Sequence, residues 1–382
     1  MEQNAVELTK ELVRIDSTNP GMGEGGMEAF LLAFAQRRGL PVEIAEVLPG
    51  RRNVMLTLPG RDPAQELIFI CHMDTVPVGA GWRETPFGAA ERDGRIYGRG
   101  SCDMKSGFAC ALSALASAAE EDAAPLRTLK LIATVDEEGD MHGAEQVIRS
   151  GWASRDSLIL DTEPTNGEIQ GAHKGRVWFE LSAAGITAHA STPWEGADAI
   201  AAMAEAVSSI RRRFLALPPH SKMGPSTVCF GRISGGSQPY VVSGDCRVTI
   251  DMRLTPPYTR QDAEALVRAA IQDAEAAVPK AKLSYRVTGD RPAVALAEDS
   301  PLLARLQTAC EAVTGSSAGT GVFPGYTDTA VLAGHLGNPN CMSYGPGSLE
   351  QAHKPDEFVP VADILRCEAV LTELARRFVF DP

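Results

Sequence analysis

The 382-residue sequence has no long hydrophobic run and no surplus of positive charge. No stretch reaches the roughly 18 apolar residues of a membrane-spanning helix, and the N-terminus has no basic segment followed by an apolar run, as a secretory signal would. The formal net charge of -13 provides no cations to neutralise phosphates, which argues against nucleic acid or an anionic membrane as a partner. We expect a cytoplasmic protein that binds neither.

Other familiar motifs are missing as well. The eight cysteines are scattered, and none forms a Cys-x-x-Cys pair, so neither a zinc knuckle nor a thioredoxin-like motif is expected. Gly315–Gly319 has the Gly-x-Ser-x-Gly spacing, but it follows a predicted helix at 301–314 and not a strand, so a nucleophile elbow for Ser-His-Asp catalysis is not expected. Gly98-x-Gly100 lacks the third glycine of a dinucleotide loop and is followed by Asp103, whose charge would repel a phosphate.

The first 170 residues alternate short apolar runs with helical patterns. The runs are apolar at nearly every position, which is typical of strands buried on both faces of a parallel sheet. They cover Val54–Leu58, Leu67–Cys71, Leu129–Val135 and Leu158–Leu160. An Ala-rich segment at about 104–120 has the pattern of a helix between two of these strands. Strand–helix–strand alternation predicts an α/β fold, with a largely parallel sheet flanked by helices.

From about residue 174 the pattern changes to four strands and two long helices, 195–214 and 259–277. The segment after residue 290 is too short for a core of its own. We therefore predict a first domain made of residues 1–174 and 290–382, interrupted by an inserted α+β domain at 175–289. This agrees with a prior of roughly 150 residues per domain.

Polar side chains follow three of the predicted strands. His72 and Asp74 come after the second strand, Glu137 and Glu138 after the third, and Asp161 and Glu163 after the fourth. In an open parallel sheet, sites form at the carboxyl ends of the strands. Three strand ends therefore place acids and an imidazole at one edge. Residues i and i+2 share a face, so Asp74 is expected to orient His72, and either Asp161 or Glu163 could reach the site.

Two further residues complete this set. Asp103 follows the glycine-rich turn before the predicted helix at 104–120, where a carboxylate suits the helix N-terminus. His353 lies in a Gly/Pro-rich loop that can reach the site from the C-terminal segment. A carboxylate can bridge two cations, and a mixture of histidine and carboxylate ligands favours zinc, cobalt or manganese over calcium. Glu137 and Glu138 diverge, so one can bind metal while the other accepts a proton.

At this point the sequence resembles the M20 family of metallopeptidases and deacylases, and most of all its acetylornithine deacetylase and succinyl-diaminopimelate desuccinylase branch. The resemblance spans almost the whole chain in order. It rests on His72–Pro77, Tyr97–Lys105, Asp136–Glu138, Glu163–Thr165, His173–Gly175 and Gly345–Glu357.

The resemblance implies a di-metal exopeptidase-like catalytic domain with these roles. Asp103 bridges two zinc ions, with cobalt or manganese as alternatives. His72 and Glu163 complete one metal site, which favours Glu163 over Asp161 as the ligand. Glu138 and His353 complete the other site. Glu137 is the general base, and Asp74 supports His72.

The family also implies that the inserted domain is a lid that mediates a homodimer. His189 would stabilise the oxyanion, often from the partner subunit, and Arg253 would bind a substrate carboxylate. Gly325 and Thr327 are further candidates for substrate binding. Tyr240 stands where the family commonly has an asparagine that touches substrate. The usual proline nearby is replaced around Ser243, and Met73 stands where threonine is frequent. These departures leave the metal site intact and bear on the substrate, which lid residues recognise.

The predicted function is two-metal hydrolysis of the amide bond in a small N-acyl amino acid. Three alternatives stay open. One is a carboxypeptidase or dipeptidase that uses the same site, and another is a hydrolase of ureido or carbamoyl groups. The third, from a different class, is a non-catalytic dimeric binding or scaffold protein, against which the complete ligand set and an intact Glu137 argue.

Overall fold

The computed structural model, which describes residues 4–382, divides into two units. Unit 1 takes in the chain up to Gly171, Leu296–Phe323 and the residues from Thr327 onward. Unit 2 consists of Ala172–Ala295 and Pro324–Tyr326. The sequence placed the two boundaries near residues 174 and 289, and it did not anticipate the short return of the chain to unit 2 at Pro324–Tyr326.

The centre of unit 1 is an eight-stranded sheet in the order β1-β2-β6-β3-β7-β14-β8-β13. The four middle strands, from β6 to β14, pair in parallel, whereas β1 with β2, β2 with β6 and β14 with β8 pair antiparallel. The strands are β1 (Val42–Leu48), β2 (Arg51–Leu58), β3 (Asp62–His72), β6 (Arg127–Thr134), β7 (Leu158–Asp161), β8 (Ile169–His173), β13 (Thr320–Phe323) and β14 (Cys341–Ser343).

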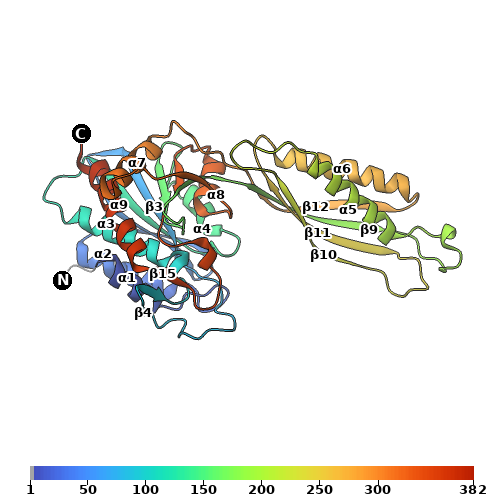
Figure 1. Ribbon diagram of the computed structural model, residues 1–382, viewed down its shortest axis with the longest axis horizontal. Helices are drawn as coiled ribbons and strands as arrows, with labels where there is room; N and C mark the ends of the chain where they lie inside the picture. The colour runs from blue at the N-terminus through green and yellow to red at the C-terminus, as the bar shows by residue number, and fades with distance from the viewer. Residues whose placement is uncertain (1–3) are drawn as a thin grey trace. The chain divides into compact units, whose positions relative to one another are not determined.

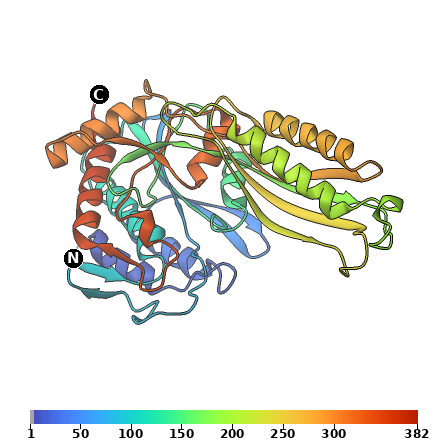
Figure 2. The same ribbon diagram turned by 45° about the vertical axis from the view of Figure 1, so that its right-hand side comes forward.

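Helices cover both faces of this sheet (Figures 1 and 2). On one face α3 packs against α1 and α9, and α7 packs against α9; on the other face α4 packs against α8. The helices of unit 1 are α1 (Ala5–Val13), α2 (Gly25–Arg38), α3 (Ser106–Ala119), α4 (His142–Arg149), α7 (Pro301–Thr314), α8 (Asp328–Leu336) and α9 (Val361–Phe380).

Strand β3 shows why the sequence produces this layered arrangement. Its last six residues are all buried, because one set of alternate side chains packs on each helical layer. Leu67 and Phe69 belong to the core that α1, α3 and α9 share. Ile68 and Ile70, which point the opposite way, are also fully buried. The predicted α/β fold with a largely parallel central sheet is confirmed.

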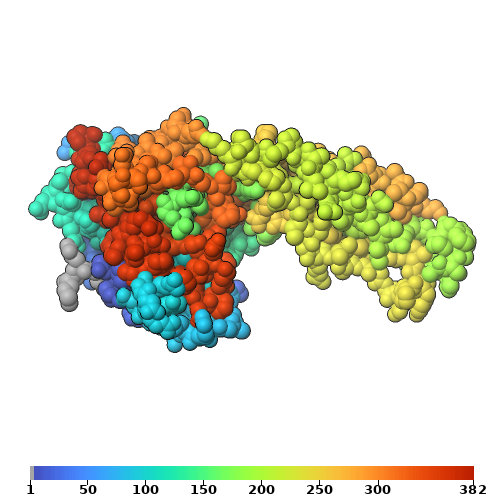
Figure 3. All heavy atoms as spheres, in the orientation of Figure 1, coloured from blue at the N-terminus to red at the C-terminus, as the bar shows by residue number. Residues whose placement is uncertain are grey.

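Unit 1 also has a small sheet in the order β15-β5-β4, made of Phe358–Pro360, Arg95–Tyr97 and Ala90–Arg92. Its β15 comes from the C-terminal part of the chain and pairs antiparallel with β5, so that Phe358 lies opposite Tyr97. Figure 3 shows C-terminal segments, in red, on the surface of unit 1 beside segments from the first hundred residues, in blue and cyan. The small sheet joins two regions that are far apart in the sequence.

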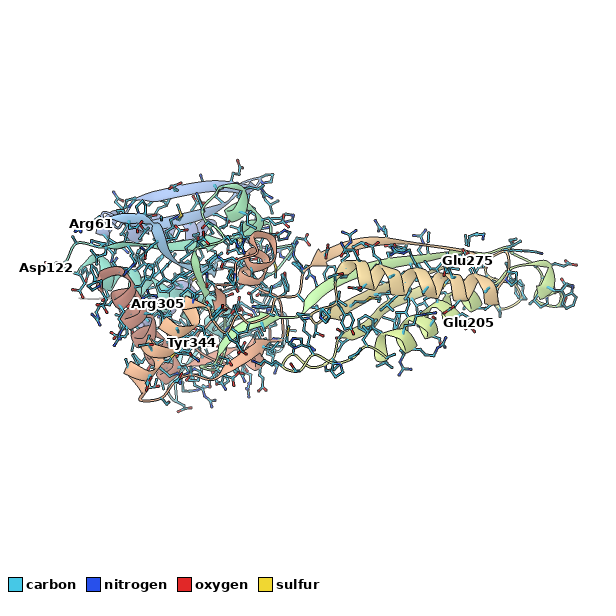
Figure 4. All side chains as sticks on the ribbon, turned by 90° about the horizontal axis from the view of Figure 1, so that it is seen from above. Arg61, Asp122, Glu205, Glu275, Arg305 and Tyr344 are labelled. Atoms are coloured by element: carbon cyan, nitrogen blue, oxygen red, sulfur yellow. The ribbon has the colours of Figure 1, made fainter. Side chains whose placement is uncertain are left out.

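Unit 2 is an antiparallel sheet in the order β10-β11-β9-β12, covered on one face by two helices. Glu205 and Glu275 mark these helices in Figure 4. The ends of the unit meet where His173 and Val294 exchange backbone hydrogen bonds of 2.9 Å. Its elements are β9 (Gly175–Ala184), α5 (Ala199–Leu215), β10 (Thr227–Gly235), β11 (Asp245–Leu254), α6 (Arg260–Ala277) and β12 (Lys282–Arg291).

The strands of unit 2 alternate in burial, unlike those of unit 1. Along β9 every second residue is buried, because only one face of the sheet packs against α5 and α6. Polar residues fix where both helices begin. The Asp198 side chain accepts the N–H groups of Ile200 and Ala201 at the start of α5, and Thr259 forms a capping box at the start of α6.

Between residues 4 and 382, no helix of the structure has both the length and the apolar composition needed to span a membrane.

Candidate metal centre

His72 is the last residue of β3 and is almost completely buried. Its Nδ1 atom lies 2.8 Å from the backbone carbonyl oxygen of Asp74 and donates a hydrogen bond to it in the corresponding tautomer. This contact leaves Nε2 for a ligand. Nε2 lies 3.1 Å from Oδ1 of Asp103 and 3.5 Å from Oε1 of Glu163.

Asp74 supports the centre in a different way from the one the sequence suggested. Its carboxylate lies 3.8 Å from Nδ1 of His72, so the backbone carbonyl, not the side chain, orients the ring. The carboxylate instead accepts the backbone N–H groups of Glu137 and Glu138, both at 3.2 Å, and the side-chain amide of Asn19 at 2.9 Å. Asp74 therefore fixes the backbone that carries the two glutamates.

The prediction that Asp103 opens a helix is wrong. Residues 101–105 form a turn with π-helical hydrogen bonding in which Asp103 has φ -117° and ψ 97°, and α3 begins only at Ser106. The N–H of Asp103 donates to the Glu357 carboxylate at 3.1 Å. The two carboxylate oxygens of Asp103 face two imidazoles: Oδ1 faces His72, and Oδ2 lies 3.3 Å from Nε2 of His353. Each carboxylate oxygen could therefore bind a different ion.

The second group of ligands joins the loop after β6 to the C-terminal segment. Nε2 of His353 lies 3.0 Å from Oε1 of Glu138. The side chain of His353 is about half exposed (51%), whereas that of Glu138 is only 8% exposed. His353 has a φ of 63°, a left-handed conformation that side chains seldom adopt, and such positions cluster at functional sites.

The structure separates Asp161 from Glu163. Asp161 is the last residue of β7 and accepts a hydrogen bond from the Thr329 hydroxyl at 2.6 Å. Glu163, two residues later, approaches His72 and is 4% exposed. Ligand atoms of His72, Glu137 and Glu163 lie within 4.8 Å of one another, as do those of His72, Asp103 and Glu138. The geometry thus favours Glu163 as the ligand.

The electrostatics of the centre match a site built for cations. Hydrogen bonds that His353 donates to the carboxylates of Asp103 and Glu138 raise its pKa to about 10. Burial lowers the pKa of His72, but the hydrogen bond with Asp103 and the charges of Glu137 and Glu163 outweigh it and raise that pKa. A raised pKa favours the protonated imidazole beside these carboxylates, and a divalent ion would take the place of that positive charge. The imidazole and carboxylate donors fit zinc, cobalt or manganese.

Glu137 is, like Glu163, a buried acid of the centre whose pKa is raised. It is 8% exposed, and burial raises its pKa well above the ordinary value, an effect that the charge of Glu138 adds to and that of His72 opposes. A carboxylate with a raised pKa beside a metal centre can accept a proton and return it.

The other predicted residues belong to neither group of candidate ligands. Three of them belong to unit 2. His189 is in an exposed loop, Arg253 pairs with Asp251 at 2.8 Å, and Tyr240 is 59% exposed. Gly325 lies in the short return of the chain to unit 2. Thr327, in unit 1, is 1% exposed, and its hydroxyl lies 2.8 Å from that of Thr329. The Thr327 hydroxyl therefore belongs to a buried hydrogen-bond network.

Sequence reasoning missed two residues that organise the centre. The amide of Asn19 joins Asp74, at 2.9 Å, to Asp136, at 3.1 Å. Glu357 accepts hydrogen bonds from the turn that carries Asp103. Glu357 stands in the last of the motifs, Gly345–Glu357, whereas Asn19 lies outside all of them. Their hydrogen-bond partners are so distant in the sequence that no local sequence pattern predicts the contacts.

Residues 68–377 match the sequence family described as Peptidase family M20/M25/M40, and the chain belongs to this family. The resemblance inferred from the motifs is confirmed. The chain is therefore a metallo-hydrolase of a family that includes dinuclear metal-binding members.

Two relatives and one solved structure illustrate the relationship. An acetylornithine deacetylase of Proteus mirabilis is 31% identical over 390 residues, with 98% of this chain and 96% of that protein covered. A probable succinyl-diaminopimelate desuccinylase of Staphylococcus aureus is 25% identical, with 94% and 93% covered. The crystal structure of the aminopeptidase PepT of Bacillus cereus superposes with a TM-score of 0.83 at 23% identity, with 99% of each chain covered. This last likeness shows the fold alone.

Proposed function

We propose that the protein hydrolyses the amide bond of a small N-acylated amino acid at a centre of two divalent ions. The observation that supports this proposal is the arrangement around Asp103. Its two oxygens face His72 and His353, and the buried Glu137 shares a ligand cluster with His72. A bridging carboxylate with an adjacent proton acceptor is what two-metal hydrolysis requires.

The ligands would divide between two ions. His72 and Glu163 would hold one ion, Glu138 and His353 the other, and Asp103 both. Zinc is the ion that these donors favour, with cobalt or manganese as substitutes. When bound, such ions polarise a carbonyl group and lower the pKa of water toward about 7.

Glu137 would carry the proton. Its carboxylate accepts a proton from the attacking water and delivers it to the leaving nitrogen, which completes cleavage of the amide. Asp74 holds Glu137 and Glu138 through their backbone N–H groups. The catalytic acid and its neighbouring ligand therefore keep fixed positions during the reaction.

Unit 2 would supply the groups that recognise the substrate. His189 would donate a hydrogen bond to the oxyanion from Nε2, since Nδ1 is 2.7 Å from the Ser191 hydroxyl and accepts the Ser191 N–H. Arg253 would bind a carboxylate of the substrate, and Tyr240 and Gly325 would contact it. We also propose that the protein is a cytoplasmic homodimer that associates through unit 2, as the family resemblance implies.

The choice of substrate class rests on the relatives. Those named acetylornithine deacetylase and succinyl-diaminopimelate desuccinylase are named for removing an acyl group from an amino acid. The identity of about 30% over nearly the full chain supports the same reaction type here. The acyl group and the side chain are left to experiment.

A hydrolysis screen tests this proposal. The protein is loaded with Zn²⁺ or Co²⁺ and assayed with N-acetyl and N-succinyl amino acids, and with dipeptides and ureido acids of matching side chains. A kcat/KM for at least one N-acyl amino acid well above that for the matching dipeptide supports the proposal. A preference for dipeptides or ureido acids assigns one of the alternative reactions. Negligible metal binding together with no turnover supports a non-catalytic protein.

A further inference from the structure

Glu357 is a buried acid with an unusual set of partners. It is 1% exposed. One oxygen, Oε1, accepts the backbone N–H groups of Cys102 at 2.8 Å and Asp103 at 3.1 Å. The other, Oε2, accepts the N–H of Gly100 at 3.1 Å and a short hydrogen bond from the Arg99 guanidinium. One carboxylate thus receives three backbone N–H groups and a cation from the turn that carries Asp103.

The same stretch of chain carries His353. Two other contacts tie it to the turn: the Cys102 thiol donates to the carbonyl of Ser348 at 3.3 Å, and the N–H of Gly98 donates to the carbonyl of Glu357 at 2.9 Å. A Cβ atom on Gly347 would lie only 2.7 Å from the Cys102 sulfur, so the two segments are in close contact. The residues from Gly347 to Glu357 therefore cradle the turn from one side.

We propose that Glu357 is a positioning residue of the metal centre. Its carboxylate fixes the Gly100–Asp103 turn against the segment that carries His353, and so sets the spacing between the bridging carboxylate and the second imidazole. In the structure this spacing is 3.3 Å, from Oδ2 of Asp103 to Nε2 of His353. The inference rests on the proposed two-ion centre but not on any particular substrate.

The chemistry of the contact explains why a carboxylate is needed. An ionised carboxylate has about four acceptor positions, enough for three N–H groups and a guanidinium, whereas an amide has one acceptor oxygen and an NH₂ group that donates. A glutamine would turn a donor toward the N–H of Gly100 and toward Arg99. A buried ion pair is weak evidence for stability, because an apolar replacement often serves as well. The four hydrogen bonds that the Glu357 carboxylate accepts from the turn therefore point to placement of the turn.

The test compares three variants by calorimetric titration with Co²⁺, by the visible absorption of the cobalt-loaded protein and by thermal melting. Glu357→Gln should weaken binding of at least one of the two ions by about 10–100-fold, the range for residues that orient metal ligands. It should also change the cobalt absorption, which reports ligand geometry, and lower kcat more than it changes KM.

The double variant Arg99→Met/Glu357→Gln separates placement from folding. Glu357→Gln alone leaves the Arg99 charge buried without its counter-ion, which lowers the melting temperature. The double variant removes that charge and should recover the melting temperature, while Co²⁺ affinity and absorption stay altered. Recovery of affinity together with melting temperature would show that the loss came from folding, and would overturn the proposal.

Asp356→Asn is the matched control. Asp356 is the neighbouring acid, and it accepts the N–H groups of Arg83 and Glu84 at 2.8 and 3.0 Å, away from the ligand turn. This variant should bind two Co²⁺ ions with unchanged affinity and absorption. Unchanged affinity and absorption in Glu357→Gln itself would also reject the role. A wild-type protein that binds two ions but hydrolyses nothing rejects the proposed reaction, and the cobalt measurements still decide the role of Glu357.

Discussion

The two units differ in what they bury. Unit 2 buries apolar side chains between one sheet face and two helices, and it pairs charges such as Glu180 with Arg286 on the open face. Unit 1 buries apolar layers on both faces of its sheet, yet it also buries Asp103, Glu137 and Glu163 at the ends of the strands.

This difference shows that the energetic cost of burying charged groups is concentrated in unit 1. Burying an ionised carboxylate is unfavourable unless it is paired, hydrogen-bonded or bound to a metal. Several like charges that share one buried edge therefore indicate chemistry, whereas the core of unit 2 requires only packing. Four predictions test whether the chemistry lies in unit 1 and what unit 2 contributes.

The largest effect is expected for Glu137→Gln in the metal-loaded protein. The amide fills the same space but cannot accept the proton, so turnover should fall by about 10³-fold, within the range for general acid–base groups. Bound metal, measured by elemental analysis, should stay at the wild-type level. A fully active variant would exclude Glu137 as the base, and a loss of metal would make it a ligand.

His189→Ala tests the contribution of unit 2. If His189 stabilises the oxyanion, kcat should fall by about 10²-fold with metal content unchanged, as for the loss of one oxyanion donor. The control is His220→Ala, because His220 also lies in unit 2 and its Nδ1 similarly accepts backbone N–H groups, those of Lys222 and Met223. Equal kcat values for the two variants would confine catalysis to unit 1.

Asn19→Ala should have a smaller effect on the same reaction. Without the amide, Asp74 keeps the two N–H groups of Glu137 and Glu138 but loses its link to Asp136. We expect kcat to fall by about 10-fold, the lower end of the 10–100-fold loss that is typical when a residue that orients metal ligands is removed. Steady-state kinetics with measured metal content checks this, and an unchanged kcat would mean that the backbone donors alone hold Asp74.

The smallest effect concerns stability in unit 2. Burial lowers the pKa of His173 from 6.5 to about 4, so the folded chain keeps this ring neutral where the unfolded chain protonates it. Stability is complete above pH 6.5 and falls as the pH drops from 6.5 to 4. At 1.36 kcal/mol for each unit of pKa difference, the loss is about 3 kcal/mol.

His173→Phe removes this titration and keeps a ring against Tyr326, which His173 meets edge-on at 6.1 Å. The difference in unfolding free energy between wild type and variant, from urea titrations at several pH values, should therefore shrink or change sign in favour of the variant toward pH 4. A difference that does not depend on pH would mean that His173 titrates normally in the folded state.

The sequence predicted the parts of the fold that repeat a pattern. The apolar runs of β3, β6 and β7 and the long helices α5 and α6 were predicted within a few residues of their observed ranges. Elements without such a pattern were missed. Strand β1 is mostly exposed, the three strands of the small sheet have three residues each, and α4 begins after Met141, whose side chain forms no cap hydrogen bond.

The candidate site divides in the same way. His72 and Glu137 could be found because each follows a buried strand, and the family motif chose Glu163 where spacing left Asp161 open. The local structure of Asp103 could not be found. Glycines before an Ala-rich segment favour a helix start, but the Glu357 carboxylate, 254 positions away in the chain, takes up the N–H of Asp103. Distant contacts of this kind override local preference.

The closure of unit 2 at His173 and Val294 has a consequence for how the protein varies. Because these two residues are hydrogen-bonded to each other, all of unit 2 except Pro324–Tyr326 leaves and re-enters the chain at one place, as a long loop with adjoining ends would. The cost of such a loop grows only slowly with its length. The sequence of unit 2 can therefore change, lengthen or shorten without a matching change in the candidate metal ligands of unit 1. Substrate specificity could change in this way while the metal centre stays the same.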